Sequence, residues 1–179
     1  MLNKEDTGLI VVDIQGKLAS LVDDSETLIE NCGKLIQGAQ ALGLPIIWLE
    51  QNPDKLGATV DSLAELMGEL TPISKFTFDG CSEIEFKHAL NEAQKHSWLI
   101  CGIETHICVY QTATHLANLH FDIHVVSDCV SSRDVRNKEL ALTKFSRENV
   151  KVTGLEMCLY ELVKDCRAPE FKQILSLIK

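Results

Sequence analysis

Short apolar runs alternate with amphipathic segments along the whole chain, and this alternation restricts the possible folds more than any other feature of the sequence. The run at residues 8–13 is apolar on both faces, which is typical of a strand buried inside a parallel sheet. Residues 25–42 follow with apolar positions at helical spacing, and Gly43 and Pro45 then provide a stop. Residues 44–49 form the next predicted strand. The pattern indicates repeated strand–helix units.

The same pattern continues to the C-terminus. One further strand is predicted to end near Lys75, and others to cover residues 98–102, 122–127 and 150–153. Helices are predicted at 61–67, 82–95, 108–119, 134–148, 155–164 and 169–178, with Ser82-x-x-Glu85 as a capping box for the second of these. We therefore expect one three-layer α/β domain over residues 1–179, built around a parallel sheet. Ligands bind such sheets beyond the carboxyl ends of the strands, where the strand order reverses.

Composition excludes several classes of protein. The net charge is −9 and no cluster of Lys and Arg stands out, so nucleic-acid binding is not expected. No apolar run approaches the ~20 residues of a membrane span, and the first residues lack the apolar core of a secretory signal, so we expect a soluble cytoplasmic protein. The seven cysteines form no Cys-x-x-Cys pair and the six histidines no His-Glu-x-x-His motif. We expect neither a disulfide framework nor a metal site, and no cofactor.

Three reactive side chains follow predicted strands in order along the chain. Asp13 ends the first strand, Lys75 the third, and Cys108 stands where a helix begins after residues 98–102. Each alone has a plain explanation: a loop carboxylate, a solvated lysine and a packed thiol. A helix N-terminus and a nearby lysine lower the pKa of a thiol, and a carboxylate accepts its proton. Together they predict an activated cysteine nucleophile.

The order Asp13, Lys75 and Gly102-Ile-Glu-Thr-His-Ile-Cys108 resembles the isochorismatase-like cysteine hydrolases, over nearly the whole chain. The resemblance is greatest to the isochorismatase domain-containing subgroup. It rests on the motifs Glu50-Gln-x-Pro-x-x-Leu-Gly-x-Thr-Val60, Cys101-Gly-Ile-Glu-x-His-x-Cys108, His124-Val-Val-x-Asp-x-x-Ser-Ser-Arg133 and Pro169-Glu-Phe-Lys-x-Ile.

This resemblance implies a Rossmann-like fold with a six-stranded parallel sheet of order 3-2-1-4-5-6. It also implies that Asp13, Lys75 and Cys108 form a catalytic triad. A non-prolyl cis peptide between Ile103 and Glu104 is implied as well, with the backbone N–H groups of Glu104 and Cys108 as an oxyanion hole. The implied reaction is hydrolysis of an amide, ureide or carbamoyl C–N bond through a thioester on Cys108. The family also implies a homo-oligomer.

Residues just beyond the strand ends are predicted to contact the substrate. Gln15, Gln51 and Phe76 are candidates, although the glutamines also suit loop capping and Phe76 also suits the core. The segment Trp48-Leu-Glu-Gln-Asn-Pro53 lacks the Asp-x-His pair that holds a metal in nicotinamidases, so metal and nicotinamide are both disfavoured. Retention of Cys108 favours acyl chemistry over the vinyl-ether cleavage of true isochorismatases.

Two other functions remain open at the level of sequence. A protein of this fold can be catalytically idle and serve as a binding or scaffold protein. A redox-responsive thiol protein is the second alternative, because a thiol of low pKa is easily oxidised. The apolar residues Phe171, Ile174, Leu175 and Ile178 suit either a subunit interface or packing within the chain.

Overall fold

A six-stranded sheet forms the centre of the protein in the computed structural model, which describes residues 1–179. Its strands lie in the order β3-β2-β1-β4-β5-β6, and every pairing between them is parallel. The strands are β1 (Thr7–Val12), β2 (Ile46–Gln51), β3 (Ile73–Lys75), β4 (Ser97–Ile103), β5 (Asp122–Ser131) and β6 (Lys151–Thr153). The predicted fold class and strand order are confirmed. The order reverses between β1 and β4, where such sheets bind ligands.

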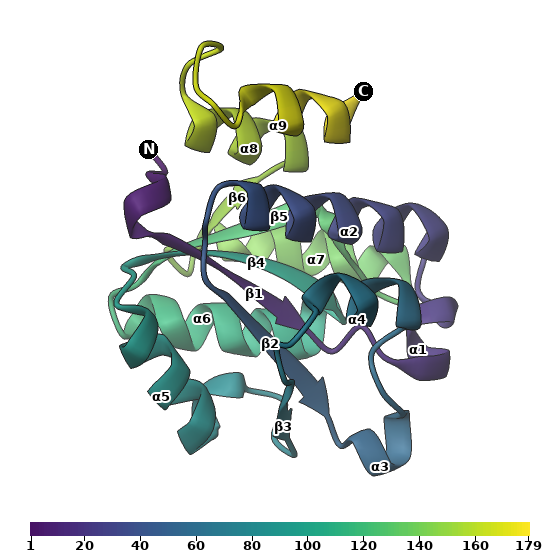
Figure 1. Ribbon diagram of the computed structural model, residues 1–179. Helices are drawn as coiled ribbons and strands as arrows, with labels where there is room; N and C mark the ends of the chain where they lie inside the picture. Colours follow the sequence, from purple (N-terminus) through teal and green to yellow (C-terminus); the bar gives the residue numbers. More distant parts are fainter.

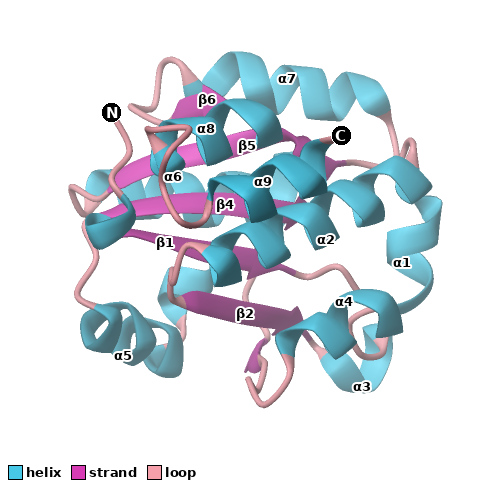
Figure 2. Cartoon of the chain, turned by 45° about the horizontal axis from the view of Figure 1, so that its top comes forward, coloured by secondary structure: helices cyan, strands magenta, loops and turns pink.

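Helices cover both faces of the sheet. They are α1 (Gly16–Leu21), α2 (Ser25–Ala41), α3 (Pro53–Leu56), α4 (Asp61–Met67), α5 (Ile84–Ala93), α6 (Tyr110–Asn118), α7 (Val135–Phe145), α8 (Leu155–Val163) and α9 (Phe171–Ile178). Figure 1 shows α2 on one side of the sheet and α5 and α6 on the other. Helices α2, α8 and α9 lie together in front of the strands in Figure 2. None of the helices combines the length and apolar character that crossing a bilayer requires.

The two faces of β1 pack into two separate hydrophobic clusters. Leu9 and Val11 belong to the cluster beneath α2, α4, α8 and α9, whereas Ile10 and Val12 belong to the cluster beneath α5, α6 and α7. Every residue of β1 is buried. The strand must therefore be apolar at consecutive positions, because alternate side chains point to opposite faces. This requirement explains the uninterrupted apolar run in the sequence.

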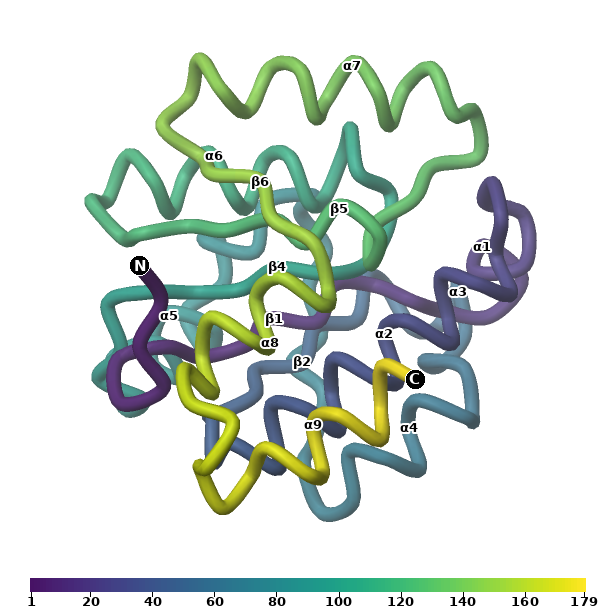
Figure 3. Tube along the Cα trace, turned by 90° about the horizontal axis from the view of Figure 1, so that it is seen from above, coloured from purple at the N-terminus to yellow at the C-terminus, as the bar shows by residue number.

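Helix α9 packs within the chain. Ile174 is fully buried in the cluster beneath α2, and Phe171 and Ile178 pack against the same cluster. Figure 3 shows α8 and α9 as neighbours, with the C-terminus returning toward α2. Of the two uses expected for the apolar C-terminal residues, the structure shows packing on the chain's own core for Phe171, Ile174 and Ile178, and Leu175 does not belong to this cluster.

The predicted capping box at Ser82 is wrong. Ser82 ends a short 3₁₀ turn, Gly80–Ser82, and α5 begins only at Ile84 with no side-chain cap. Asp79 caps the 3₁₀ turn instead, because its side chain accepts a hydrogen bond from the backbone N–H of Cys81. The acidic cap therefore lies three residues before the predicted one.

Strand β5 runs four residues beyond its predicted end. An irregularity in its register with β4, between Ile100 and Gly102, separates the regular pairing from a second stretch in which Ile103 pairs with Ser131. This second stretch places residues 131–133 beside the loop that follows β4. The position of that loop matters because it leads to Cys108.

Candidate active site

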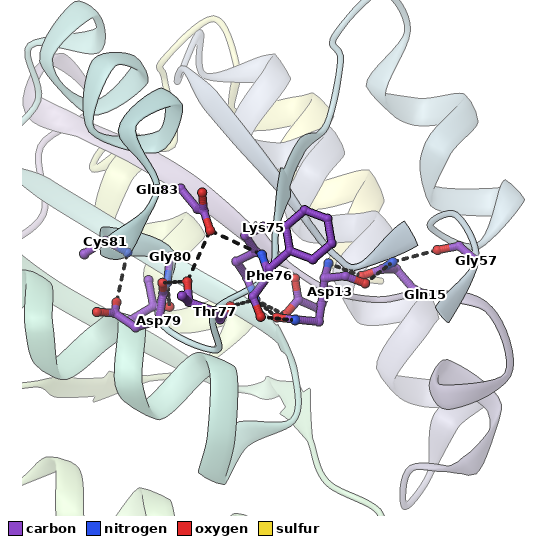
Figure 4. A network of polar contacts seen from close by, with 12 residues as sticks. Asp13, Gln15, Gly57, Lys75, Phe76, Thr77, Asp79, Gly80, Cys81 and Glu83 are labelled. Carbon is purple, nitrogen blue, oxygen red and sulfur yellow. Dashed lines mark hydrogen bonds and ion pairs between the residues drawn. The ribbon is translucent and has the colours of Figure 1, made fainter. Parts of the chain in front are cut away.

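Lys75 lies at the carboxyl end of β3 and its side chain is completely buried. Its Nζ donates to Asp13 Oδ2 and to Gln51 Oε1, each at 2.7 Å, and to the carbonyl oxygen of Thr77 at 3.3 Å. These three acceptors match the three N–H donors of an ammonium group. Figure 4 shows this network at the ends of the strands. Lys75 therefore reaches across the end of β2 to the residue that follows β1.

Asp13 is the first residue after β1 and has a left-handed backbone conformation, with φ 54°. Its backbone N–H donates to the carbonyl oxygen of Leu49 at 3.1 Å, which holds it against β2. Its Oδ1 is buried and has no hydrogen-bond partner within the chain. Burial raises the pKa of the Asp13 carboxyl, although the charge and the hydrogen bond of Lys75 oppose the rise. One carboxylate oxygen is thus occupied by Lys75 and the other remains available.

Cys108 lies in a single turn of π-helix, Thr105–Val109, that runs directly into α6. The predicted helix start is therefore three residues late, and the thiol lies within the first helical turn. Cys108 is buried, with 7% of the residue exposed. Burial and the charge of Asp13 raise its pKa to about 12, and Lys75 opposes this rise. The predicted lowering of the Cys108 pKa is wrong, because burial and a neighbouring carboxylate outweigh the lysine.

The loop between β4 and Cys108 exposes backbone donors at its start. The peptide bond between Ile103 and Glu104 is cis. The backbone N–H of Glu104 has no acceptor within the chain, as is usual for a donor at the beginning of a helix. The Glu104 carboxylate accepts hydrogen bonds from the backbone N–H and Nε of Arg133, at 3.0 and 3.1 Å. His106 Nδ1 lies 3.0 Å from Ser132 Oγ. The end of β5 thus holds this loop in place.

The two predicted substrate-contacting glutamines have different positions. Gln15 is fully buried and bonds only to backbone: its Nε2 donates to the carbonyl oxygens of Gln51 and Gly57, and its Oε1 accepts from the N–H of Gln51. Gln51 donates from Nε2 to the carbonyl oxygen of Phe76. Gln51 also lines the cavity beside Asp13, whereas Gln15 does not. Gln15 therefore stabilises the backbone around the site and does not line the cavity.

Phe76 does not form the predicted apolar wall. The residue is 69% exposed and is not among those that line the cavity, and Phe78 lines the cavity instead. Successive residues of an extended segment point to opposite sides, so the residue after the inward-facing Lys75 points outward. Phe78 would face the same side as Phe76 in a straight strand, but the chain bends over residues 76–79, and this bend turns Phe78 to the cavity. The alternation of a strand therefore gave no signal for Phe78.

A cavity of about 80 Å³ lies between Asp13 and Cys108. Its wall is mainly apolar and is formed by Leu18, Leu56, Phe78, Ile103 and Ile107, with Asp13, Gln51, Glu104 and Cys108 as the other lining residues. A small reacting group placed here contacts the thiol, the free Asp13 oxygen and the start of the π-helical turn. The arrangement suits nucleophilic attack on a small electrophile.

Comparison with known families identifies the chain's relatives. The family model for the isochorismatase domain matches residues 7–157, a segment that contains Asp13, Lys75 and Cys108. The chain belongs to the isochorismatase family. This confirms the resemblance predicted from the strand-end residues, and membership of this family supports a hydrolytic activity.

Individual relatives of the family cover much of the chain. The secreted isochorismatase effector Isc1 of Phytophthora sojae is 33% identical over 175 residues, which are 96% of this chain and 83% of that protein. Isochorismatase domain-containing protein 1 of Danio rerio is 37% identical over 82% of this chain, and the match covers 51% of that longer protein. The solved structure described as the MAR1 ribonuclease of Caenorhabditis elegans superposes with a TM-score of 0.93, at 33% identity over 99% of this chain and 91% of that one.

Proposed function

We propose that the protein hydrolyses a C–N bond of a small neutral molecule, an amide, a ureide or a carbamoyl compound, with Cys108 as the nucleophile. The observation that carries the proposal is the unpartnered Oδ1 of Asp13 beside a buried thiol. A thiol whose pKa is raised to about 12 needs a base within reach, and this oxygen is that base.

The first half of the reaction forms a thioester. Asp13 takes the proton from Cys108 Sγ, and the resulting thiolate attacks the substrate carbonyl carbon. The backbone N–H groups of Glu104 and Cys108 stabilise the negative oxygen of the tetrahedral intermediate. The C–N bond then breaks, and the leaving nitrogen takes the proton from Asp13. In the second half, water attacks the thioester carbonyl carbon while Asp13 takes a proton from it. The C–S bond then breaks, the acid product leaves, and the Cys108 thiolate takes the proton back from Asp13.

Lys75 has an electrostatic role in this scheme. Its charge lowers the pKa of both Asp13 and Cys108 and so opposes the effect of burial on each. Because the Nζ is held by three acceptors, the ammonium stays next to Asp13 while the proton moves. Lys75 keeps the carboxylate ionised and stabilises the thiolate once it forms.

The cavity favours a small uncharged group. Its wall is mainly apolar, and the Asp13 carboxylate repels an anion placed beside it. These features argue against isochorismate, a dicarboxylate, and against RNA, which the net charge of −9 also repels. Because the Phytophthora protein is named an isochorismatase effector and the Caenorhabditis protein a ribonuclease, the substrate panel must include both isochorismate and RNA.

We also propose a homo-oligomer in the cytosol that needs no cofactor for this reaction. Phe76, Phe78 and Ile84 are all more than half exposed, which is unusual for large apolar side chains and suits contact with another subunit. All seven cysteines are unpaired, which suits a reducing compartment.

A substrate panel tests the proposal. Small primary amides, ureides and carbamoyl compounds, with isochorismate and an RNA oligonucleotide as further arms, are incubated with wild type, Cys108→Ala and Cys166→Ala. Cys166 is the exposed cysteine and serves as the matched control. We expect ammonia or amine release from wild type and Cys166→Ala only, and an acyl adduct on Cys108 by intact mass. Turnover by Cys108→Ala, or turnover of isochorismate or RNA alone, contradicts the proposal.

The same panel separates the two alternatives. A catalytically idle protein gives no product in any arm and no adduct on Cys108. A redox-responsive thiol protein gives no product but oxidises at Cys108 under dilute peroxide. The raised pKa of Cys108 argues against the redox alternative, because the thiolate is the form that oxidises readily.

A further inference from the structure

Three potential metal ligands meet outside the proposed catalytic centre. Asp79 and Cys81 lie in the loop between β3 and α5, and His115 lies on α6. One ligand atom of each residue lies within 4.8 Å of the other two. His115 Nδ1 is 2.6 Å from Asp79 Oδ2. The mechanism proposed above uses none of these three side chains.

We propose that Asp79, Cys81 and His115 bind one zinc ion. A thiolate, an imidazole and a carboxylate are the ligand types that zinc takes in proteins, and three protein ligands with a water are a common set. With bonds of about 2.0–2.3 Å, two ligand atoms on a tetrahedral ion lie about 3.3–3.8 Å apart. The carboxylate–imidazole pair must therefore open slightly, and the most distant pair must close by at most about 1–1.5 Å. Side-chain rotation supplies movements of this size.

The loop that carries two of the ligands is already fixed to the helix that carries the third. The backbone N–H of Gly80 donates to Thr112 Oγ1 at 2.9 Å, and Thr112 precedes His115 by one turn of α6. The backbone N–H of Cys81 donates to Asp79 Oδ1 at 2.9 Å and orients the carboxylate. Such outer contacts fix the geometry of metal ligands. Figure 4 shows Asp79, Gly80 and Cys81 together in this loop.

Burial and charge also suit a cation at this position. Cys81 is fully buried, whereas the side chains of His115 and Asp79 are 42% and 18% exposed. An ion thus enters from the side of His115 and keeps a solvent water as its fourth ligand. Binding replaces the proton of the Cys81 thiol, which passes to solvent, with a sulfur–zinc bond. The thiolate and the Asp79 carboxylate together balance the two positive charges of the ion.

Zinc at this site fixes one wall of the active-site cavity. The loop that ends with Asp79 begins at Lys75, and Phe78, which lines the cavity, is the residue before the first ligand. The carbonyl oxygen of Thr77 also accepts from Lys75 Nζ. We infer a structural zinc ion that positions this loop and takes no direct part in the chemistry at Cys108.

Metal titration of the full chain tests the site. All proteins carry Cys108→Ala, which removes the thiol of the proposed catalytic centre as a competing ligand, and the Cys166→Ser control accounts for the exposed thiol. Zinc affinity is measured by competition with a chromophoric chelator, and cobalt substitution reports thiolate ligation through its charge-transfer band in the near ultraviolet. We expect the parent protein, which carries only Cys108→Ala, to bind one equivalent of zinc and to show a cobalt–thiolate band. Cys81→Ser should abolish the band, and both it and His115→Gln should weaken zinc binding by about tenfold or more.

Matched variants keep the test decisive. Cys166→Ser and His88→Gln replace exposed residues of the same types and should bind zinc as the parent does. Because His115 is partly exposed, His115→Gln remains informative even if Cys81→Ser does not fold. The proposal is overturned if the parent binds no stoichiometric zinc, if the band persists in Cys81→Ser, or if His115→Gln binds unchanged. None of these outcomes bears on C–N hydrolysis, since every protein tested lacks Cys108.

Discussion

At the scale of single residues, Lys75 and Asp13 form a buried ion pair with a Nζ–Oδ2 distance of 2.7 Å. The two side chains are 0% and 2% exposed, so both charges have left water. Each of the two charges needs the other as its partner, because a buried charge without a partner destabilises a protein strongly. The pair therefore links the stability of the fold to the electrostatics of the candidate site.

Lys75→Met tests this link. The variant leaves Asp13 buried without a countercharge, and we expect a loss of about 3–5 kcal/mol in the free energy of unfolding near neutral pH. The Asp13 pKa is already raised in the folded protein, and removal of Lys75 raises it further. A carboxyl with a raised folded pKa favours folding most below its unfolded pKa and loses this contribution as pH rises through the folded pKa. The loss of unfolding free energy in Lys75→Met, relative to wild type, should therefore become smaller as the pH is lowered.

Denaturant unfolding at several pH values measures this change. Lys172→Met, at an exposed position on α9, is the control and should change stability little at any pH. A deficit for Lys75→Met that stays constant from neutral to acidic pH contradicts the assignment of the effect to Asp13.

The pH dependence of turnover belongs to the same residues. Asp13 must be ionised to accept the thiol proton, so kcat/KM should fall as pH drops through its pKa. Because burial raises this pKa, the acid limb should lie above the ordinary value of 3.8. Ionisation of Cys108 itself, with a pKa of about 12, should give no limb in the neutral range. A pH profile with the substrate found in the panel checks this, and a limb at or below 3.8 contradicts it.

At the scale of secondary-structure elements, the contact between the ends of β1 and β4 brings the two halves of the site together. Gly102 has φ +126°, and a Cβ atom placed there would lie 2.0 Å from the carbonyl oxygen of Val12. Val12 precedes Asp13, and Gly102 precedes the loop to Cys108. Only a glycine allows both this conformation and this approach.

Gly102→Ala should therefore destabilise the protein by more than about 2 kcal/mol, from left-handed strain together with the backbone clash. Gly33→Ala on α2 is the matched variant. Its Cβ would meet the Leu66 side chain at 3.5 Å, an ordinary contact, and helical alanine should stabilise by up to about 1 kcal/mol. Thermal unfolding compares the two. Equal effects of the two substitutions would show that the β1–β4 contact tolerates a side chain.

Elements with long apolar periodicity were predictable from the sequence, and short polar ones were not. The predicted bounds of α2 and of the apolar core of β4 agree closely with the structure, because burial on one or two faces dictates their composition. Helices α1 and α3 were missed, since four to six residues hold too little periodicity to detect. The capping box failed because Ser82 and Asp79 both suit a helix start, and only the contacts of the loop decide between them.

The candidate site was predictable in its reactive residues but not in its environment. The order of Asp13, Lys75 and Cys108 along the chain places them at one edge of a parallel sheet. The direction of the Cys108 pKa shift depends on burial, which the sequence does not display. The choice of Phe78 over Phe76 depends on which way a short loop turns after an edge strand.

At the scale of the whole molecule, the proposed homo-oligomer predicts a measurable mass. The chain weighs 19.9 kDa. Sedimentation or light scattering over a range of concentrations should give a multiple of this mass, because the exposed side chains of Phe76, Phe78 and Ile84 are then covered by another subunit. A mass of one chain at all concentrations contradicts this proposal and leaves the family assignment untouched.

The small size of the cavity has a practical consequence for covalent labelling. Five of the seven cysteines are buried in packed surroundings, Cys166 is exposed, and Cys108 alone borders a cavity of about 80 Å³. We expect a compact, uncharged warhead such as chloroacetamide to label Cys108 as well as Cys166, and a bulky maleimide to label Cys166 in preference. The ratio of Cys108 labelling by chloroacetamide to Cys166 labelling by maleimide then measures how accessible the cavity is, and it can be determined in living cells.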